Sequence, residues 1–283
     1  MLNLILIIIT FLVLLAASYS DLKTREVPDL LNYGLIFTAL GIRAIYSVEL
    51  GWEVLASGLL GLAACFILAS LFYYSHQWGG GDSKLLMGMG AIIGISYPFD
   101  FSSFNILLYF VTLLFVGAFY GILWLFYLAI KNKKIFLTSY KKKLLDYRIL
   151  HFAVLIISTL FILSLFFVSS IWFFFIFPPI AFYLFILVSV VEEHFFIKKV
   201  DISKLTEGDW LEEEVVVHGK TIISDRTLEK KHLTLLNKLK EEGKINKVTI
   251  KEGIPFIPSF LFAYLILIYG SNIFNWIFQK LFI

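Results

Sequence analysis

Residues 2–20, L-N-L-I-L-I-I-I-T-F-L-V-L-L-A-A-S-Y-S, contain no charged side chain and are long enough to cross a bilayer as a helix. About 20 apolar residues span the hydrocarbon core. The run lacks the positively charged start of a secretory signal peptide, which favours a retained helix. Further apolar runs predict helices near 30–47, 54–75, 83–98, 103–130, 150–169, 171–197 and 256–281.

The composition is typical of a helical membrane protein. Of the 283 residues, 59% are hydrophobic and only 16% are charged, whereas soluble domains are about half apolar and a quarter charged. One cysteine, Cys65, excludes an internal disulfide and a cysteine-based zinc cluster. We therefore predict an all-α polytopic membrane protein with about eight transmembrane helices, six to eight being compatible with the sequence. The apolar block 150–197 can divide at Ser169–Ser170 or at Pro178–Pro179.

Lys and Arg are distributed unevenly between the predicted helices. They occur in D-L-K-T-R-E-V-P-D (21–29), in H-Q-W-G-G-G-D-S-K (76–84) and in a basic loop at 131–148. They are absent from V-E-L-G-W-E (48–53) and Y-P-F-D-F-S (97–102). Because positive residues concentrate on the cytoplasmic side, this pattern predicts an even number of spans with both termini outside.

Residues 198–254 are soluble in character. E-E-V-V-V-H-G-K-T-I-I-S predicts two strands around a turn at His218–Gly219. Apolar residues at helical spacing predict a helix over Thr227–Lys240, and K-V-T-I-K predicts a third strand. These elements predict a small cytoplasmic α+β insertion. The predicted domains are thus a four-helix membrane core at 1–98, further helices at 99–197, the insertion at 198–254 and a last helix within 255–283.

The segment W-G-G-G-D-S-K, residues 78–84, places a carboxylate after three glycines. Asp82 there can cap the following helix, because an N-cap side chain accepts hydrogen bonds from first-turn amides. Three glycines exceed what a cap requires, and glycine lets another backbone approach closely. The segment therefore has two interpretations, a polar helix cap or half of a catalytic site.

A second carboxylate, Asp21, lies at the inside end of the first predicted helix. The predicted topology puts Asp21 and Asp82 at the same membrane face and at similar depth. Two close carboxylates share a proton, so one can act as a base on water while the other protonates the attacked carbonyl. Because a helix N-terminus favours a charged carboxylate, we provisionally assign the base to Asp82, within a pair that titrates as one unit.

Residues 20–32, S-D-L-K-T-R-E-V-P-D-L-L-N, together with G-G-G-D-S-K at 79–84, resemble the paired motifs of a known family. This family contains the type IV prepilin peptidases and the archaeal preflagellin peptidases, which are GxGD-type membrane aspartic proteases. The resemblance implies that Asp21 and Asp82 are the catalytic pair. It also implies that the glycine part of the motif, which would lie beside the substrate, is Gly79, Gly80 and Gly81.

The resemblance is specific in residues 1–98, and G-I-P-F-I-P-S-F at 253–260 resembles the closing segment of archaeal members. Bacterial members often carry a cysteine-rich insertion and a methyl-transferring activity. This chain has neither those cysteines nor a recognisable cofactor site, which favours the short archaeal type. The hairpin at 150–197 exceeds the six-helix core expected of that type.

Other charged residues near the predicted inside face are weaker candidates for substrate binding. The cations anchor the protein to lipid phosphates, or they favour the ionised form of the nearby aspartates. Asp29, which follows Pro28, is either the N-cap of the second helix or a polar group near the site. Glu192 and Glu193 are either solvated at a helix end or steer a basic leader peptide. These candidates are Lys23, Arg25, Asp29, Lys84, Glu192 and Glu193.

The resemblance implies a multi-pass aspartic endopeptidase that removes short basic leader peptides from prepilin-like or preflagellin precursors at the cytoplasmic membrane face. The expected partners are these precursors and membrane lipids, without nucleic acid, metal or cofactor. Two alternatives stay open. One is a secondary transporter with Asp21 and Asp82 as a proton or cation site, and the other is a non-catalytic assembly protein of a pilus or archaellum base.

Overall fold

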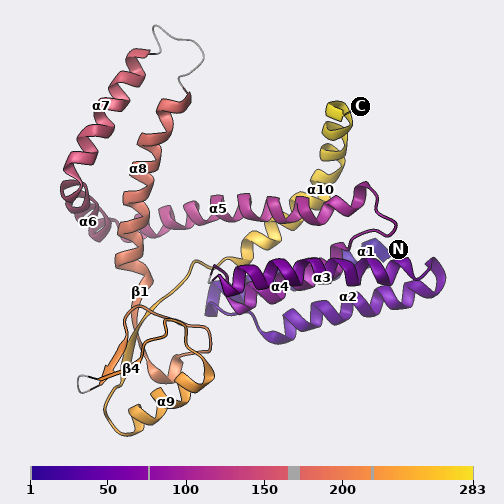
Figure 1. Ribbon diagram of the computed structural model, residues 1–283, viewed down its shortest axis with the longest axis horizontal. Coiled ribbons are helices and arrows are strands. Elements are labelled where there is room, and N and C mark those ends of the chain that lie inside the picture. The colour runs from indigo at the N-terminus through magenta and orange to yellow at the C-terminus, as the bar shows by residue number, and fades with distance from the viewer. Residues whose placement is uncertain (1, 76, 165–172, 218–219, 283) are drawn as a thin grey trace. The chain divides into compact units, whose positions relative to one another are not determined.

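The structure is a computed structural model that describes residues 2–75, 77–164, 173–217 and 220–282 (Figure 1). It divides into two compact units. Unit 1 contains Met1–Gly121 and Ile254–Ile283, and unit 2 contains Ile122–Gly253. The predicted four-part division of the chain stays a prediction.

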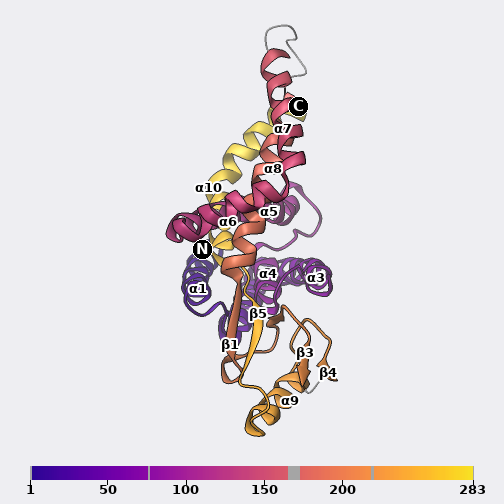
Figure 2. The same ribbon diagram turned by 90° about the vertical axis from the view of Figure 1, so that its left-hand side faces the viewer.

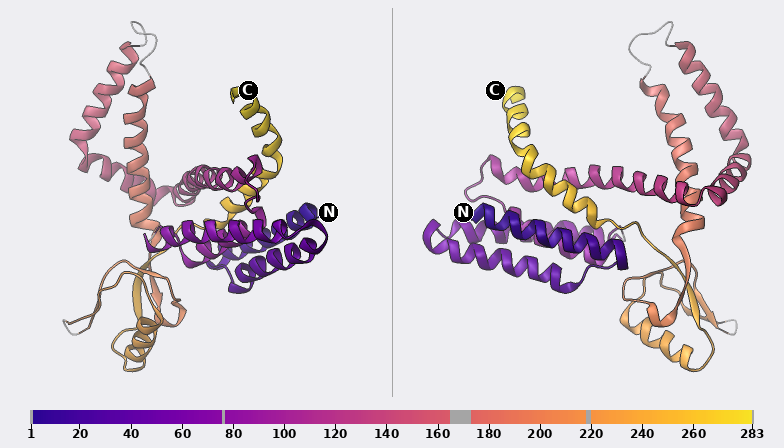
Figure 3. Two further views of the ribbon diagram at one scale, coloured as in Figure 1. Left: turned by 45° about the vertical axis from the view of Figure 1, so that its right-hand side comes forward. Right: turned by 180° about the vertical axis from the view of Figure 1, so that it is seen from behind.

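Unit 1 is a bundle of helices. Its helices are α1 (Leu2–Thr24), α2 (Asp29–Leu50), α3 (Glu53–Tyr74), α4 (Gly80–Ile93), the first part of α5 (Asn105–Lys131) and α10 (Ile257–Phe282). Helix α4 packs against both α2 and α3, and α1 packs against α2 and α10 (Figure 3). The core between these helices is apolar, with Leu14, Leu35, Leu85, Leu86 and Phe260 fully buried.

Helices α3 and α4 approach closely because glycines face each other across their interface. A Cβ added at Gly61 would lie 2.2 Å from the carbonyl oxygen of Gly90, and a Cβ added at Gly90 would lie 2.3 Å from that of Gly61. Small residues permit this backbone contact, which is a common way for membrane helices to pack. The close contact positions α4, whose first turn carries Asp82.

Replacing Gly61 by alanine is expected to lower the free energy of unfolding by about 3 kcal/mol, because a methyl group there collides with backbone that cannot give way. Unfolding in detergent micelles, followed by circular dichroism, measures this loss. Gly41→Ala is the matched control, since a Cβ at this α2 glycine meets no atom within 4 Å. Equal stability of the two variants would contradict the proposed role of the α3–α4 contact.

Arg43 of α2 holds the C-terminal end of α4. The side chain is only 7% exposed. Its Nε donates to the Ala91 carbonyl at 2.9 Å, and its Nη2 donates to the Ile92 carbonyl at 2.7 Å. Its Nη1 donates to the Val54 carbonyl of α3 at 3.1 Å. Because the last carbonyls of a helix have no partner within the helix, this guanidinium satisfies acceptors that the core would otherwise leave unpaired.

Unit 2 begins with helices. Helix α6 (Lys133–Asp146) occupies the segment that was predicted to be a basic loop at 131–148, so that prediction is wrong. Helix α7 (Arg148–Ser164) and α8 (Phe173–Val191) follow. Pro178 and Pro179 lie inside α8, so the chain does not divide there. The other predicted break, Ser169–Ser170, lies outside the described residues.

The rest of unit 2 is a small α+β region, as predicted (Figure 2). Strands β1 (Ile197–Asp201), β5 (Lys247–Lys251) and β2 (Trp210–Leu211) form an antiparallel sheet in the order β1-β5-β2, and helix α9 is Lys230–Glu241. Strands β3 (Val215–Val217) and β4 (Lys220–Ile223) form the predicted antiparallel pair. The predicted turn at His218–Gly219 lies outside the described residues, and β1 and β2 were not predicted.

The fold class is confirmed, but the predicted number of about eight spans is not. Among the described residues, five helices are long and apolar enough to cross a membrane, namely α1, α2, α3, α5 and α8. The number is six if α6 and α7, which meet at a bend of 87°, form one broken span. Helix α4 has only 14 residues, which is too short to count.

Candidate active site

Asp21 lies in the last turn of α1 and is only 7% exposed. Its Oδ2 accepts a hydrogen bond of 2.9 Å from the backbone N–H of Ile257, at the start of α10. Helix α1 ends immediately after this turn, where Arg25 adopts a positive φ of 63°. The buried carboxylate therefore joins the first and last helices of unit 1.

Asp82 lies in the first turn of α4. Gly79, with extended backbone, is the N-cap of this helix, so the prediction that Asp82 is the N-cap is wrong. Asp82 is instead the third helical residue, and its Oδ2 accepts a hydrogen bond of 3.2 Å from the Gly79 backbone N–H. This contact satisfies one of the unpaired amides that every helix N-terminus exposes.

The two carboxylates lie within electrostatic range of each other, and the helices that carry them are in contact. They come from different helices, α1 and α4, and each accepts one backbone hydrogen bond. Like charges at short range resist simultaneous ionisation, so such a pair can hold a single shared proton. Since each carboxylate has one backbone donor, the assignment of the base to Asp82 stays a prediction.

The glycines before Asp82 leave open space. A Cβ at Gly79 would come no closer than 3.5 Å to Asp82, and one at Gly80 no closer than 3.9 Å to Tyr73. A Cβ at Gly81 would make ordinary contact with Val27 at 3.5 Å. None of the three glycines has a positive φ. The fold therefore tolerates a methyl group at each position, and its absence needs a reason outside the packing.

An aromatic cluster anchors the chain next to these glycines. The Trp78 ring lies 4.7 Å from that of Phe72 on α3 and 5.7 Å from that of Phe256, just before α10. It also packs on Phe260 in α10, at 5.8 Å between ring centroids. The segment Phe256–Ile257 thus contacts Trp78 with its ring and Asp21 with its backbone N–H, which brings the two predicted motifs together.

The charged residues around the pair have definite contacts. Lys84 of α4 donates to Asp29 of α2 at 2.5 Å, and its Nζ also lies over the Tyr33 ring. Pro28 is the N-cap of α2, so Asp29 is not the predicted cap but links two helices. Arg25 is close enough for its charge to attract the Asp21 carboxylate, in keeping with the tuning role considered for the cations.

Three of the weaker candidates have contacts that do not involve the pair. Lys23 lies over the Tyr19 ring, with its Nζ 5.8 Å from the ring centroid. In unit 2, Glu192 pairs with Lys251, and Glu193 pairs with Lys143. These ion pairs occupy the carboxylates that were considered for steering a basic leader. The prediction that the two glutamates bind substrate stays untested.

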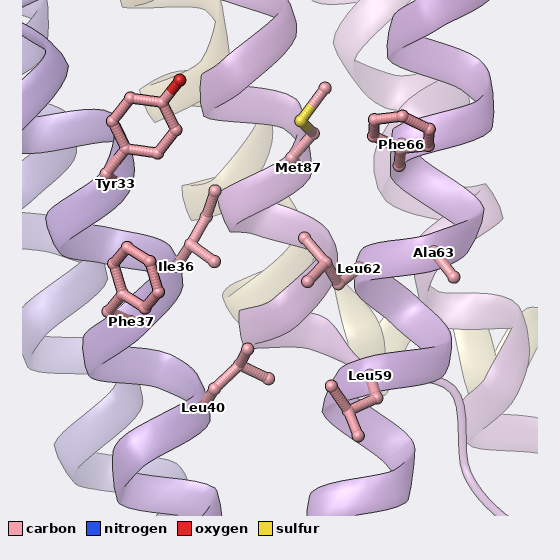
Figure 4. A pocket seen from close by; sticks show the side chains of 9 residues that line it. All are labelled: Tyr33, Ile36, Phe37, Leu40, Leu59, Leu62, Ala63, Phe66 and Met87. Carbon is pink, nitrogen blue, oxygen red and sulfur yellow. The ribbon is translucent and has the colours of Figure 1, made fainter.

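An apolar groove of about 470 Å³ runs between α2 and α3 (Figure 4). Tyr33 and Phe37 line it from α2, Phe66 lines it from α3, and Met87 of α4 lies between them. Met87 follows Asp82 by five residues, which is about one and a half turns of helix. Because the Tyr33 ring also contacts Lys84, the groove begins beside the charged end of α4.

Sequence reasoning missed three features of this site. The Ile257 backbone N–H bonds to Asp21 from 236 residues away, and only the proline-rich start of the last helix gave a signal for it. Arg43, which holds the far end of α4, was hidden inside an apolar run. Asn32 ends the motif at 20–32, but the sequence did not indicate that its side chain is completely buried.

These observations describe a helical membrane protein with two carboxylates at the ends of separate helices, α1 and α4, that contact each other. Residues 8–130, which contain both carboxylates, match the type IV leader peptidase family. Through this segment the chain is similar to members of that family.

Relatives with established names agree. The preflagellin peptidases of Methanococcus maripaludis (strain C6), Methanococcus voltae and Methanocaldococcus jannaschii are 37%, 37% and 36% identical over 93, 87 and 85 residues. These matches cover 30%, 30% and 28% of this chain and 37%, 36% and 34% of the relatives. The chain therefore spans about a third of the length of the curated relatives it matches.

Proposed function

We propose that this protein is a membrane-embedded aspartic endopeptidase that removes short basic leader peptides from prepilin-like or preflagellin precursors. The observation that carries the proposal is the placement of Asp21 and Asp82, two carboxylates on contacting helices within electrostatic range of each other. The match of residues 8–130 to the type IV leader peptidase family and the names of the three relatives support the substrate class. The site faces the cytoplasm, where Lys and Arg of the adjoining segments are retained.

The chemistry needs only the two carboxyl groups and water. The ionised carboxylate removes a proton from water while the water oxygen bonds to the scissile carbonyl carbon. The protonated partner gives its proton to the carbonyl oxygen. When the intermediate collapses, the C–N bond breaks, the proton taken from water moves to the leaving amine, and the second carboxyl regains its proton. The pair ends with one shared proton, as it began.

The glycines supply access for the substrate backbone. The peptide around the scissile bond passes Gly79, Gly80 and Gly81, where no side chain keeps it from Asp82. The apolar helix that follows the scissile bond lies along the membrane-facing side of unit 1. The groove beside Met87 offers it apolar surface close to Lys84.

Alanine at Gly80 or Gly81 is expected to slow cleavage about 100-fold without unfolding the protein, since small misplacements of a substrate cost rates of this order. The free energy of unfolding should be unchanged or higher by up to about 1 kcal/mol, because alanine is the better helix former. Initial cleavage rates and thermal unfolding in micelles measure the two effects. Gly41→Ala, whose Cβ meets nothing within 4 Å, should change neither rate nor fold. Wild-type cleavage by both site variants would remove the proposed role of the glycines.

Co-expression with a panel of precursors tests the proposal as a whole. Each precursor carries a short basic leader before an apolar helix, and cleavage is read as a mobility shift and by the new N-terminal sequence. Matched precursors without the leader should not shift. If no precursor shifts although the chain is present in the membrane at normal level, the peptidase proposal fails.

A further inference from the structure

Asn32 is a buried amide without a hydrogen-bond partner. Its side chain is 0% exposed, and among the described residues neither its Oδ1 nor its Nδ2 has a partner. An unpaired polar group in a core destabilises the fold, because it gives up its hydrogen bonds to water without replacement. Asn32 lies on the buried face of α2 together with Leu35 and Ala39, where an apolar residue would pack without this cost.

The packing of α2 on α4 places Asn32 at the depth of the carboxylate pair. Val27 contacts the position of Gly81, Asp29 pairs with Lys84, and Leu35 contacts the position of Gly88. In these three contacts the residue numbers differ by 54, 55 and 53, so Asn32 lies level with residues 85–87 of α4. That level is about one helical turn, or about 5.4 Å, beyond Asp82.

Helix α1 leads to the same depth. Asp21 precedes the end of α1 at Thr24 by three residues, and Asn32 follows the start of α2 at Asp29 by three residues. The two helices pack against each other and are joined by a short connection. Asn32 and Asp21 are therefore close to the same level in the bundle, on neighbouring helices.

We propose that Asn32 is a third residue of the catalytic site and binds the water molecule that the two carboxylates activate. Two hydrogen bonds of about 2.8 Å placed end to end span about the one turn that separates the amide from Asp82. The amide neither gains nor loses a proton in the reaction. Its Oδ1 accepts a hydrogen bond from the water, and this bond orients the water oxygen toward the scissile carbonyl.

This inference rests on the proposed function and predicts that stability and activity change in opposite directions. Asn32→Leu has similar size but no polar atoms, so it should unfold at a temperature equal to or above that of wild type. Its kcat should fall about 100-fold with KM unchanged, because only an interaction with the reacting water is lost. Asn32→Ser, which keeps a small group able to bind water, should recover part of kcat.

The matched control is Thr10→Val, which removes a fully buried hydroxyl from α1 that already bonds to the Leu6 carbonyl. This variant should keep wild-type kcat and KM. Wild-type kcat in Asn32→Leu would overturn the inference. It would also be overturned if Asn32→Leu lost stability and Asn32→Ser restored stability and kcat in equal proportion, because activity would then simply follow the folded fraction. The wild-type protein distinguishes failure of this inference from failure of the whole proposed function, because in the second case it would cleave no precursor at all.

Discussion

Asp21→Asn and Asp82→Asn are each expected to reduce leader cleavage about 1,000-fold or more, because under the proposed function either change removes a proton-transfer group from a pair that works as a unit. Asparagine has the size of aspartate and still accepts the hydrogen bond that Ile257 or Gly79 donates. The bundle should therefore assemble normally. The measurement is the initial rate of cleavage of a leader-bearing precursor, with the amount of each variant in the membrane determined in parallel.

Asp146→Asn is the control for the same chemical change elsewhere. Asp146 is an exposed residue at the end of α6 in unit 2, and its replacement should leave the cleavage rate unchanged. The double variant Asp21→Asn with Asp82→Asn should be no slower than either single variant, since each already removes the pair. Wild-type cleavage by either single variant would show that the pair is not the catalyst.

Arg43→Met is expected to lower the free energy of unfolding by about 3–5 kcal/mol. The guanidinium donates to the carbonyls of Ala91, Ile92 and Val54, and methionine leaves those of Ala91 and Ile92, at the end of α4, unpaired in an apolar core. Each unsatisfied buried acceptor costs about 1–3 kcal/mol. Because α4 carries Asp82 at its other end, cleavage should fall with the folded fraction rather than through a change in KM.

Unfolding in micelles at increasing denaturant concentration measures this loss. Arg43→Lys keeps a charge and fewer donors, so its stability should lie between those of wild type and Arg43→Met. Arg148→Met is the matched control, because Arg148 is an exposed residue at the start of α7. If Arg43→Met and Arg148→Met were equally stable, the hydrogen bonds to the end of α4 would not contribute to folding.

Much of unit 1 could be predicted because its information is local. Long apolar runs identify α1, α2 and α3 regardless of context, and the two motif carboxylates lie where charge pattern and helix ends place them. The cap of α4 could not be predicted to the residue, since a glycine and an aspartate three positions apart are both acceptable N-caps. In the structure Gly79, with extended backbone, is the N-cap.

Other features depend on contacts that the sequence does not display. Helix α6 contains K-K-I-F-L-T-S-Y-K-K-K-L-L-D, whose charge indicated a loop although Lys and Leu are good helix formers. Arg43 interrupts an apolar run, and only the three-dimensional structure reveals which helix end it holds. Strand β1, I-K-K-V-D, was missed because three of its five residues are charged and its partner β5 lies about 50 residues away along the chain.

The hydrogen bond from Ile257 to Asp21 has a consequence for biosynthesis. A ribosome adds 235 further residues between Asp21 and Ile257, so this hydrogen bond cannot form until those residues have been synthesised. A nascent chain that has inserted α1 to α5 already holds both aspartates but lacks this donor and the aromatic rings of Phe256 and Phe260. Under the proposed function, the site is therefore complete only after α10 has entered the bilayer, long after both aspartates have been made.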